Sequence, residues 1–237
     1  MNADWKVLPA MGIKIPPNFP VEAYLKVKSN LEIVPSNKRI SFNLAWAGIA
    51  FRYRASYEYG EQFTNSIIKY TGAPPPEERY KQEKYLLGFF VNAISTLECF
   101  FFSTYCIAAI VKPNEFPMKV EDDLKVYPWT VVKKFNENYK SCNLTKKQSK
   151  CCDDVICKEM YSMRDVFSHR GLPTRTFYHG GARDGIATMP KNPKAPSDQW
   201  LSDFRLDDQM TSSYITWLSA TLEELIEATN SFCKEKF

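Results

Sequence analysis

The stretch from Tyr85 to Val111 constrains the fold of this chain more than any other segment does. It is almost continuously apolar and, as a helix, is long enough to cross a lipid bilayer. Two polar residues, Asn92 and Glu98, interrupt it, and a carboxylate near the middle of a span is costly in lipid. The same pattern is typical of the central, buried helix of a soluble bundle. Because the chain has no second apolar segment of this length, we favour the buried helix over a membrane-attached protein.

Prolines and turn residues divide the rest of the chain into segments. Residues 1–36 are rich in proline, which predicts an extended N-terminal arm packed on the body of the protein. Beyond the arm, apolar periodicity and helix-stop residues predict five helices. The expected helices run from about 37 to 70, 77 to 111, 128 to 139, 145 to 170, and from Asp207 or Asp208 towards residue 237.

The pattern changes between Pro173 and the last helix. Short runs bounded by turn residues at 174–178, 185–189 and 200–204 predict a small β-rich excursion. The expected fold class is therefore all-α, a bundle of four to five helices over residues 37–237. A β or loop insertion is expected within it at about 174–206.

Composition excludes several classes of function. Only nine glycines are present, which argues against a glycine-rich phosphate loop and against an all-β fold with many turns. The net charge of +4 is compatible with nucleic-acid binding without requiring it. Cys151, Cys152 and Cys157 lack both a two-residue-spaced pair and a nearby histidine, so neither a metal site nor another cofactor is expected. The first residues do not resemble a signal peptide, and we expect a reducing, cytoplasmic location.

The chemistry-bearing residues gather at the end of the expected helix 145–170. His169, one of only two histidines, lies five residues after Arg164. Asp165 lies one turn before His169 on the same helix face, where its carboxylate can hold the imidazole. On a straight helix, the side chain of Arg164 instead points in a direction about 140° away from that of His169 around the helix axis. The two would converge only if the helix distorts, or if two chains about a two-fold axis supply them to a shared cleft.

The segment Arg164-Asp165-Val-Phe-Ser-His169 resembles the signature of the HEPN superfamily (higher eukaryotes and prokaryotes nucleotide-binding). That signature is an arginine, a polar residue, several further residues and a histidine. Residues 86–98 also resemble the long core helix of such domains. The resemblance implies a dimer whose two motifs face each other and, in active members, a metal-independent endoribonuclease. It also implies that Arg164 stabilises the phosphorane charge, that His169 acts as acid or base, and that Asp165 orients one of them.

Further residues could belong to the same site. Asn92, Ser95 and Glu98 form a polar strip on the central helix that could line the cleft, or they are buried polar groups satisfied by neighbouring helices. Arg170, beside the motif, is a further binding candidate. Tyr178-His-Gly-Gly181 could be a mobile substrate loop with Arg175 and Arg183 as phosphate contacts. We favour the alternative, a glycine turn with exposed charges.

The expected function is that of an RNA-cleaving enzyme of the toxin–antitoxin or phage-defence kind. Its expected partners are RNA, a second copy of the chain, and a protein inhibitor or antitoxin, without a membrane. The main alternative is a non-catalytic HEPN module that binds a nucleotide or a partner protein. An arginine beside an acidic residue on a helix is often only a surface ion pair, and a histidine at a helix end is often only a cap.

Overall fold

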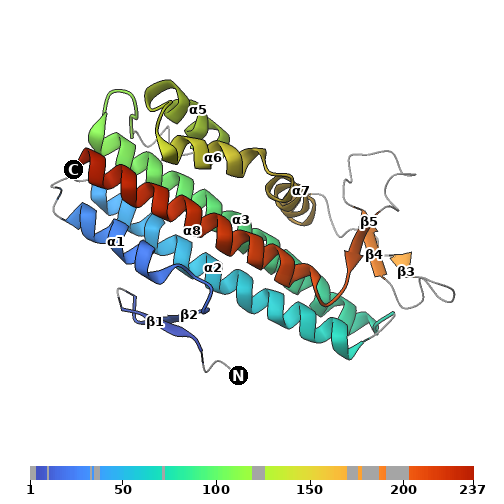
Figure 1. Ribbon diagram of the computed structural model, residues 1–237. Coiled ribbons are helices and arrows are strands. Elements are labelled where there is room, and N and C mark those ends of the chain that lie inside the picture. The colour runs from blue at the N-terminus through green and yellow to red at the C-terminus, as the bar shows by residue number, and fades with distance from the viewer. Residues whose placement is uncertain are drawn as a thin grey trace. The chain divides into compact units, whose positions relative to one another are not determined.

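The computed structural model describes residues 4–9, 11–32, 34, 38–70, 73–118, 126–169, 176–177, 187–190 and 203–237. Among these residues it contains seven α-helices and two small antiparallel sheets, so the predicted all-α class is confirmed (Figure 1). The helices are α1 (Val21–Glu32), α2 (Lys38–Lys69), α3 (Pro76–Val111), α5 (Pro128–Asn138), α6 (Asn143–Asp153), α7 (Val155–His169) and α8 (Met210–Lys236). The strands are β1 (Lys6–Leu8), β2 (Ile13–Ile15), β3 (Thr176–Phe177), β4 (Ala187–Pro190) and β5 (Asp203–Leu206).

The chain forms two compact units, each with its own internal packing. Unit 1 comprises residues 1–54, 95–154 and 218–237, and unit 2 comprises residues 55–94 and 155–217. The three longest helices, α2, α3 and α8, contribute a segment to each unit.

The core of unit 1 is built around Trp46 on α2. Its ring stacks on Tyr24 of α1 with the ring centroids 5.0 Å apart, and on Phe42 one turn earlier in α2 at 5.3 Å. Two reciprocal hydrogen bonds join the same pair of helices. The Tyr24 hydroxyl donates to the Trp46 carbonyl oxygen at 2.9 Å, and the Trp46 indole N–H donates to the Tyr24 carbonyl oxygen at 3.2 Å. These hydrogen bonds offset the cost of removing the polar atoms of both rings from water, and they hold α1 against α2.

The prediction of an extended arm over residues 1–36 is wrong for most of its length. Strands β1 and β2 pair as an antiparallel hairpin, and residues Val21–Glu32 form helix α1. Tyr24, Val27 and Leu31 are buried at three- and four-residue spacing, which is the periodicity of an amphipathic helix. The prolines of the arm lie before or after this helix, where they do not interrupt its hydrogen bonds.

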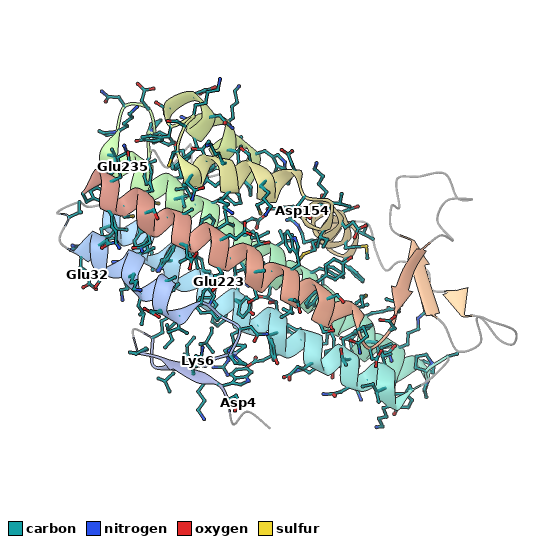
Figure 2. The ribbon with its side chains drawn as sticks, viewed as in Figure 1. Asp4, Lys6, Glu32, Asp154, Glu223 and Glu235 are labelled. Atoms are coloured by element: carbon teal, nitrogen blue, oxygen red, sulfur yellow. The ribbon has the colours of Figure 1, made fainter. Side chains whose placement is uncertain are left out.

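The expected single helix 145–170 is also a wrong prediction, because it is two helices, α6 and α7. Asp154, labelled in Figure 2, separates them with extended backbone angles (φ −63°, ψ 137°). Aspartate is disfavoured inside helices because its side chain competes for backbone hydrogen bonds. It is favoured at the position directly before a helix begins. This break and the additional helix α1 raise the number of helices in the described residues from the expected four or five to seven.

Unit 2 is held together between α2 and α8 by small polar side chains. The Thr211 hydroxyl donates to the carbonyl oxygen of Gly60 at 3.2 Å and lies 3.0 Å from the hydroxyl of Thr64. Thr211 is buried, so these hydrogen bonds offset the loss of water at its hydroxyl group. They fix the start of α8 beside α2.

The excursion before α8 contains strands, as predicted. Strands β3, β4 and β5 form an antiparallel sheet in that order, with Thr176 opposite Thr188 and Thr188 opposite Arg205. The expected runs at 174–178, 185–189 and 200–204 overlap these strands; the third starts three residues and ends two residues before β5.

Helix α3 contains the apolar stretch that dominates the sequence. Among the described residues it is the one helix long and apolar enough to cross a membrane, with a mean hydropathy of 1.7 over its most apolar window. Of that window, 67% is buried inside the protein. Most of the stretch therefore lies in contact with the chain itself.

Candidate functional site

Helix α7 carries the predicted motif and packs in unit 2 through one apolar face. Met160, Met163 and Phe167 are buried on this face. The Phe167 ring stacks on Phe90 of α3, with centroids 6.0 Å apart and ring planes 18° apart. This packing fixes the rotation of α7 about its axis and so determines which of its polar residues reach solvent.

Arg164 is held by two neighbours on its own helix. Its guanidinium lies over the ring of Tyr161, with the central carbon 5.5 Å from the ring centroid. Its Nε lies 3.2 Å from Oδ1 of Asp165. The Arg164 side chain is 26% exposed and that of Asp165 is 48% exposed, so this ion pair is partly screened by water. The aromatic face and the carboxylate together restrict the orientation of a partly buried cation.

The structure shows which side chain Asp165 contacts, a point that the sequence left open. The sequence offered either Arg164 or His169 as the group that Asp165 orients, and the observed contact is with Arg164. His169 is the last residue of α7, and its side chain lies outside the described part of the structure, as do Arg170 and Arg175. The predicted contact between Asp165 and the imidazole therefore stays a prediction.

The backbone of α7 bears on how Arg164 and His169 could share one site. The helix is uninterrupted from Val155 to His169. The side chains of residues five positions apart on such a helix point about 140° away from each other around its axis. On such a helix the two side chains point apart, and the sharing of one site by two chains stays a prediction.

A second polar contact on α7 was not predicted from the sequence. The Tyr214 hydroxyl of α8 donates a hydrogen bond to Oε2 of Glu159 at 3.1 Å. The Tyr214 ring packs edge-on against Phe90, with centroids 5.8 Å apart. Burial, with a smaller effect of the neighbouring carboxylate, raises the pKa of the Tyr214 phenol above its usual range. The contact couples α7 to α8, and no local sequence signal could reveal it because its two residues are 55 positions apart.

Two residues of the predicted polar strip on α3, Asn92 and Glu98, have different surroundings. Asn92 belongs to unit 2, is buried, and its amide donates to the carbonyl oxygen of Gly88 at 2.7 Å. Ser95 and Glu98 belong to unit 1. The hydrogen bond of Asn92 to its own helix is of the kind expected for a buried polar group that is satisfied locally.

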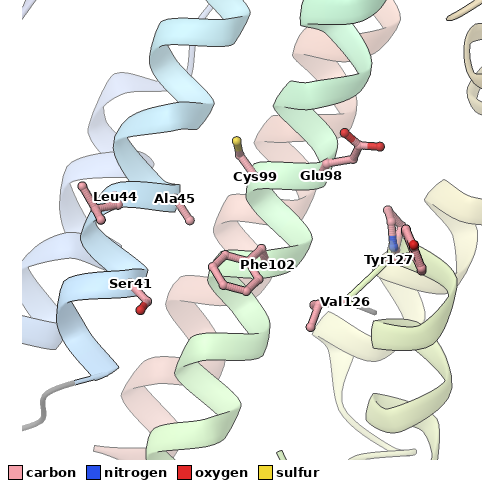
Figure 3. Close-up of a pocket in the computed structure, with 9 residues that line it drawn as sticks. Ser41, Leu44, Ala45, Glu98, Cys99, Phe102, Val126 and Tyr127 are labelled. Atoms are coloured by element: carbon pink, nitrogen blue, oxygen red, sulfur yellow. The ribbon is translucent and has the colours of Figure 1, made fainter. Parts of the chain in front are cut away.

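Glu98 instead lines a groove in unit 1. The groove has a volume of about 670 Å³, and Figure 3 shows α2 on one side of it and the start of α5 on the other, with α3 between them. Its lining is mostly apolar and includes Leu44, Phe102 and Tyr127. The thiol of Cys99 also lines it, and burial raises the pKa of this thiol above its usual range. Sequence reasoning placed Glu98 on the central helix without revealing this groove, because its walls come from three separate parts of the chain.

Metal ligation finds no support in the described part of the chain, where no three His, Cys, Asp or Glu residues gather closely enough to hold an ion. Comparison with known proteins gave no match among family models, curated proteins or solved structures. The chemistry open to α7 is that of an oriented cation. A planar guanidinium presents several N–H donors, which suit the oxygens of a phosphate group.

Proposed function

We propose that this chain is a metal-independent endoribonuclease of the HEPN type, acting in the cytoplasm as a dimer in toxin–antitoxin or phage-defence systems. The observation that carries the proposal is the setting of Arg164, a partly buried guanidinium oriented by Tyr161 and Asp165 on α7. A cation fixed before substrate arrives stabilises developing negative charge without reorganising during the reaction. The resemblance of residues 164–169 to the HEPN signature supplies the other half of the site, His169.

The proposed reaction needs only the RNA and these side chains. His169 of one chain removes the proton of the ribose 2′-hydroxyl, and the 2′-oxygen attacks the adjacent phosphorus. Arg164 balances the extra negative charge of the phosphorane. The bond from phosphorus to the 5′-oxygen then breaks, and the imidazolium of His169 returns its proton to that oxygen, which restores the neutral histidine. The products are a 2′,3′-cyclic phosphate and a 5′-hydroxyl end.

The divergence of Arg164 and His169 on α7 supports a dimer as the active form. In the proposed arrangement, each site takes Arg164 from one chain and His169 from the other, about a two-fold axis. Arg170 and Arg175 are proposed to contact flanking phosphates, and a protein inhibitor would act by covering the shared cleft.

The test is cleavage of labelled RNA by purified protein in the presence of EDTA. Arg164→Ala and His169→Ala should each lower the rate by about 10²–10⁴. Lys158→Ala, which removes an exposed cation from the same helix, is the matched control and should leave the rate unchanged. DNA of the same sequence should resist because it lacks the attacking hydroxyl.

Two results would overturn the assignment. Equal cleavage by wild type and both alanine variants would mean that these side chains do not carry the reaction. Binding of RNA or a nucleotide by the wild type without any cleavage would identify the chain as a non-catalytic binding module.

A further inference from the structure

The first half of α2 is apolar on two opposite sides. One side, which includes Trp46 and Ile49, is fully buried in the core of unit 1. The other side carries Ile40, Leu44 and Phe51, which are 67%, 72% and 56% exposed. A row of large apolar side chains exposed on the side opposite the core is typical of a contact surface. Within the part of the chain that the structure describes, this second side is largely exposed.

The bare residues share one helix face. Ile40 and Leu44 are four residues apart, and Phe51 follows seven residues later, with the half-exposed Ala47 between them. Positions 40, 44, 47 and 51 therefore follow the alternating four- and three-residue spacing of the seam between two packed helices. We refer to these four residues as the α2 face.

The α2 face continues into the groove of unit 1. Leu44 forms part of one wall of the groove, and Tyr127, 57% exposed, forms part of the other (Figure 3). The ring of Phe102 lies between them on α3 (Figure 3). The face and the groove thus form one apolar surface on a single unit.

We propose that a second copy of this chain covers the α2 face and the adjoining groove. The large side chains Ile40, Leu44, Phe51 and Tyr127 together expose roughly 500 Å², a patch size that marks interaction sites. The same surface on two chains amounts to roughly 1,000 Å² before any polar rim is added, which meets the minimum area of about 1,000 Å² for a biological interface.

Self-complementarity favours a second copy over other occupants. A seam with this spacing packs against another of the same spacing, and a two-fold axis brings the same seam of a second chain against the first. Arg52 and Glu98 both lie close enough to Cys99 to act on its thiol. Each copy therefore carries both signs of charge close to the groove, which suits an interface between identical chains. A small molecule of the volume of the groove would leave Ile40 and Phe51 bare.

This inference does not depend on the proposed ribonuclease, because the α2 face lies in unit 1 and the motif lies in unit 2. The test is sedimentation equilibrium of the full chain over a range of concentrations. Leu44→Lys places a charge at the centre of the proposed interface and should raise the dissociation constant about tenfold or more. At an intermediate concentration, the variant should have half the mass of the wild type.

The matched control is Ile68→Lys, which changes a 59% exposed isoleucine on the same helix but outside the α2 face. It should associate as the wild type does. Because Leu44 is largely exposed, Leu44→Lys should fold normally, which circular dichroism checks; Ile40→Lys serves as a second variant.

Three results would overturn the proposal. The first is a wild type that stays monomeric at all concentrations. The second is an oligomer whose mass neither Leu44→Lys nor Ile40→Lys changes. The third is a monomer that sediments with vesicles of phosphatidylcholine and phosphatidylserine and loses this binding in Leu44→Lys, which would assign the α2 face to a lipid surface.

Discussion

Replacing Gly88 with alanine should destabilise unit 2, although alanine is the better helix former. A Cβ atom added at Gly88 of α3 would lie 2.7 Å from three ring carbons of Tyr59 on α2. Carbon atoms normally approach no closer than about 3.5 Å. One of the three is the Cγ atom, next to the Tyr59 backbone, so the ring cannot swing away at its far end alone.

The size of the effect follows from two opposing terms. Alanine in place of glycine inside a helix contributes about 1 kcal/mol in favour of folding. Forcing one methyl group into a closely packed contact costs about 1–3 kcal/mol. The clash is severe because three atoms are involved, so the net loss should be about 1–2 kcal/mol, which lowers the melting temperature by roughly 2–8 °C.

Urea unfolding of a double-mutant cycle measures the two terms separately. In the wild-type background, Gly88→Ala should lower the free energy of unfolding. In a Tyr59→Ala background the ring is absent, and the same substitution should raise it by up to about 1 kcal/mol. If Gly88→Ala stabilises the protein in both backgrounds, α2 and α3 do not approach as closely as the structure has them.

Further predictions concern other buried or paired groups. Because the pKa of the Tyr214 phenol is raised, its stabilising effect is complete below pH 10 and is lost as the pH rises above 10. In urea titrations at a series of pH values above 10, the free energy of unfolding should fall less steeply with pH in Tyr214→Phe than in the wild type. Burial raises the pKa of the Cys233 thiol to about 12, so thiol reagents should modify it only on unfolding, followed by peptide mass spectrometry. Asp165→Asn should change the free energy of unfolding by less than about 1 kcal/mol, since its ion pair with Arg164 is partly exposed.

The long helices could be predicted from sequence because their ends carry strong local signals. The expected segments 37–70, 77–111 and 128–139 differ by no more than one residue at either end from α2, α3 and α5. Proline supplies several of these boundaries: Pro76 and Pro128 each begin a helix, a position where the missing N–H costs nothing.

Helix α1 and the break at Asp154 could not be predicted as readily, for opposite reasons. In the arm, five prolines outweighed the apolar periodicity of Tyr24, Val27 and Leu31, although all of them lie outside the helix. At Asp154, the apolar periodicity continues on both sides, and only a change in one residue's backbone angles ends α6. A single aspartate tolerates both helical and extended backbone, so tertiary packing decides between them.

In the candidate site too, contacts between residues close in sequence could be predicted, whereas contacts between distant residues could not. Tyr161 lies three residues before Arg164, so helix geometry alone places the ring beside the guanidinium. Glu159 and Tyr214 come together only because α7 and α8 pack in unit 2. The groove beside Glu98 likewise depends on packing among α2, α3 and α5 within unit 1, which no local pattern records.

The partners of Arg164 bear directly on the proposed chemistry. An arginine already paired with a carboxylate must exchange that carboxylate for the substrate phosphate. The exchange costs little free energy here, because the Asp165 side chain is 48% exposed and a phosphate can accept two parallel hydrogen bonds from a guanidinium. The Tyr161 ring contacts the guanidinium from its face, so that contact does not compete with either anion for N–H donors. Tyr161 can therefore keep Arg164 oriented while Asp165 is displaced, which makes the aromatic ring, rather than the ion pair, the contact that holds the cation in the proposed reaction.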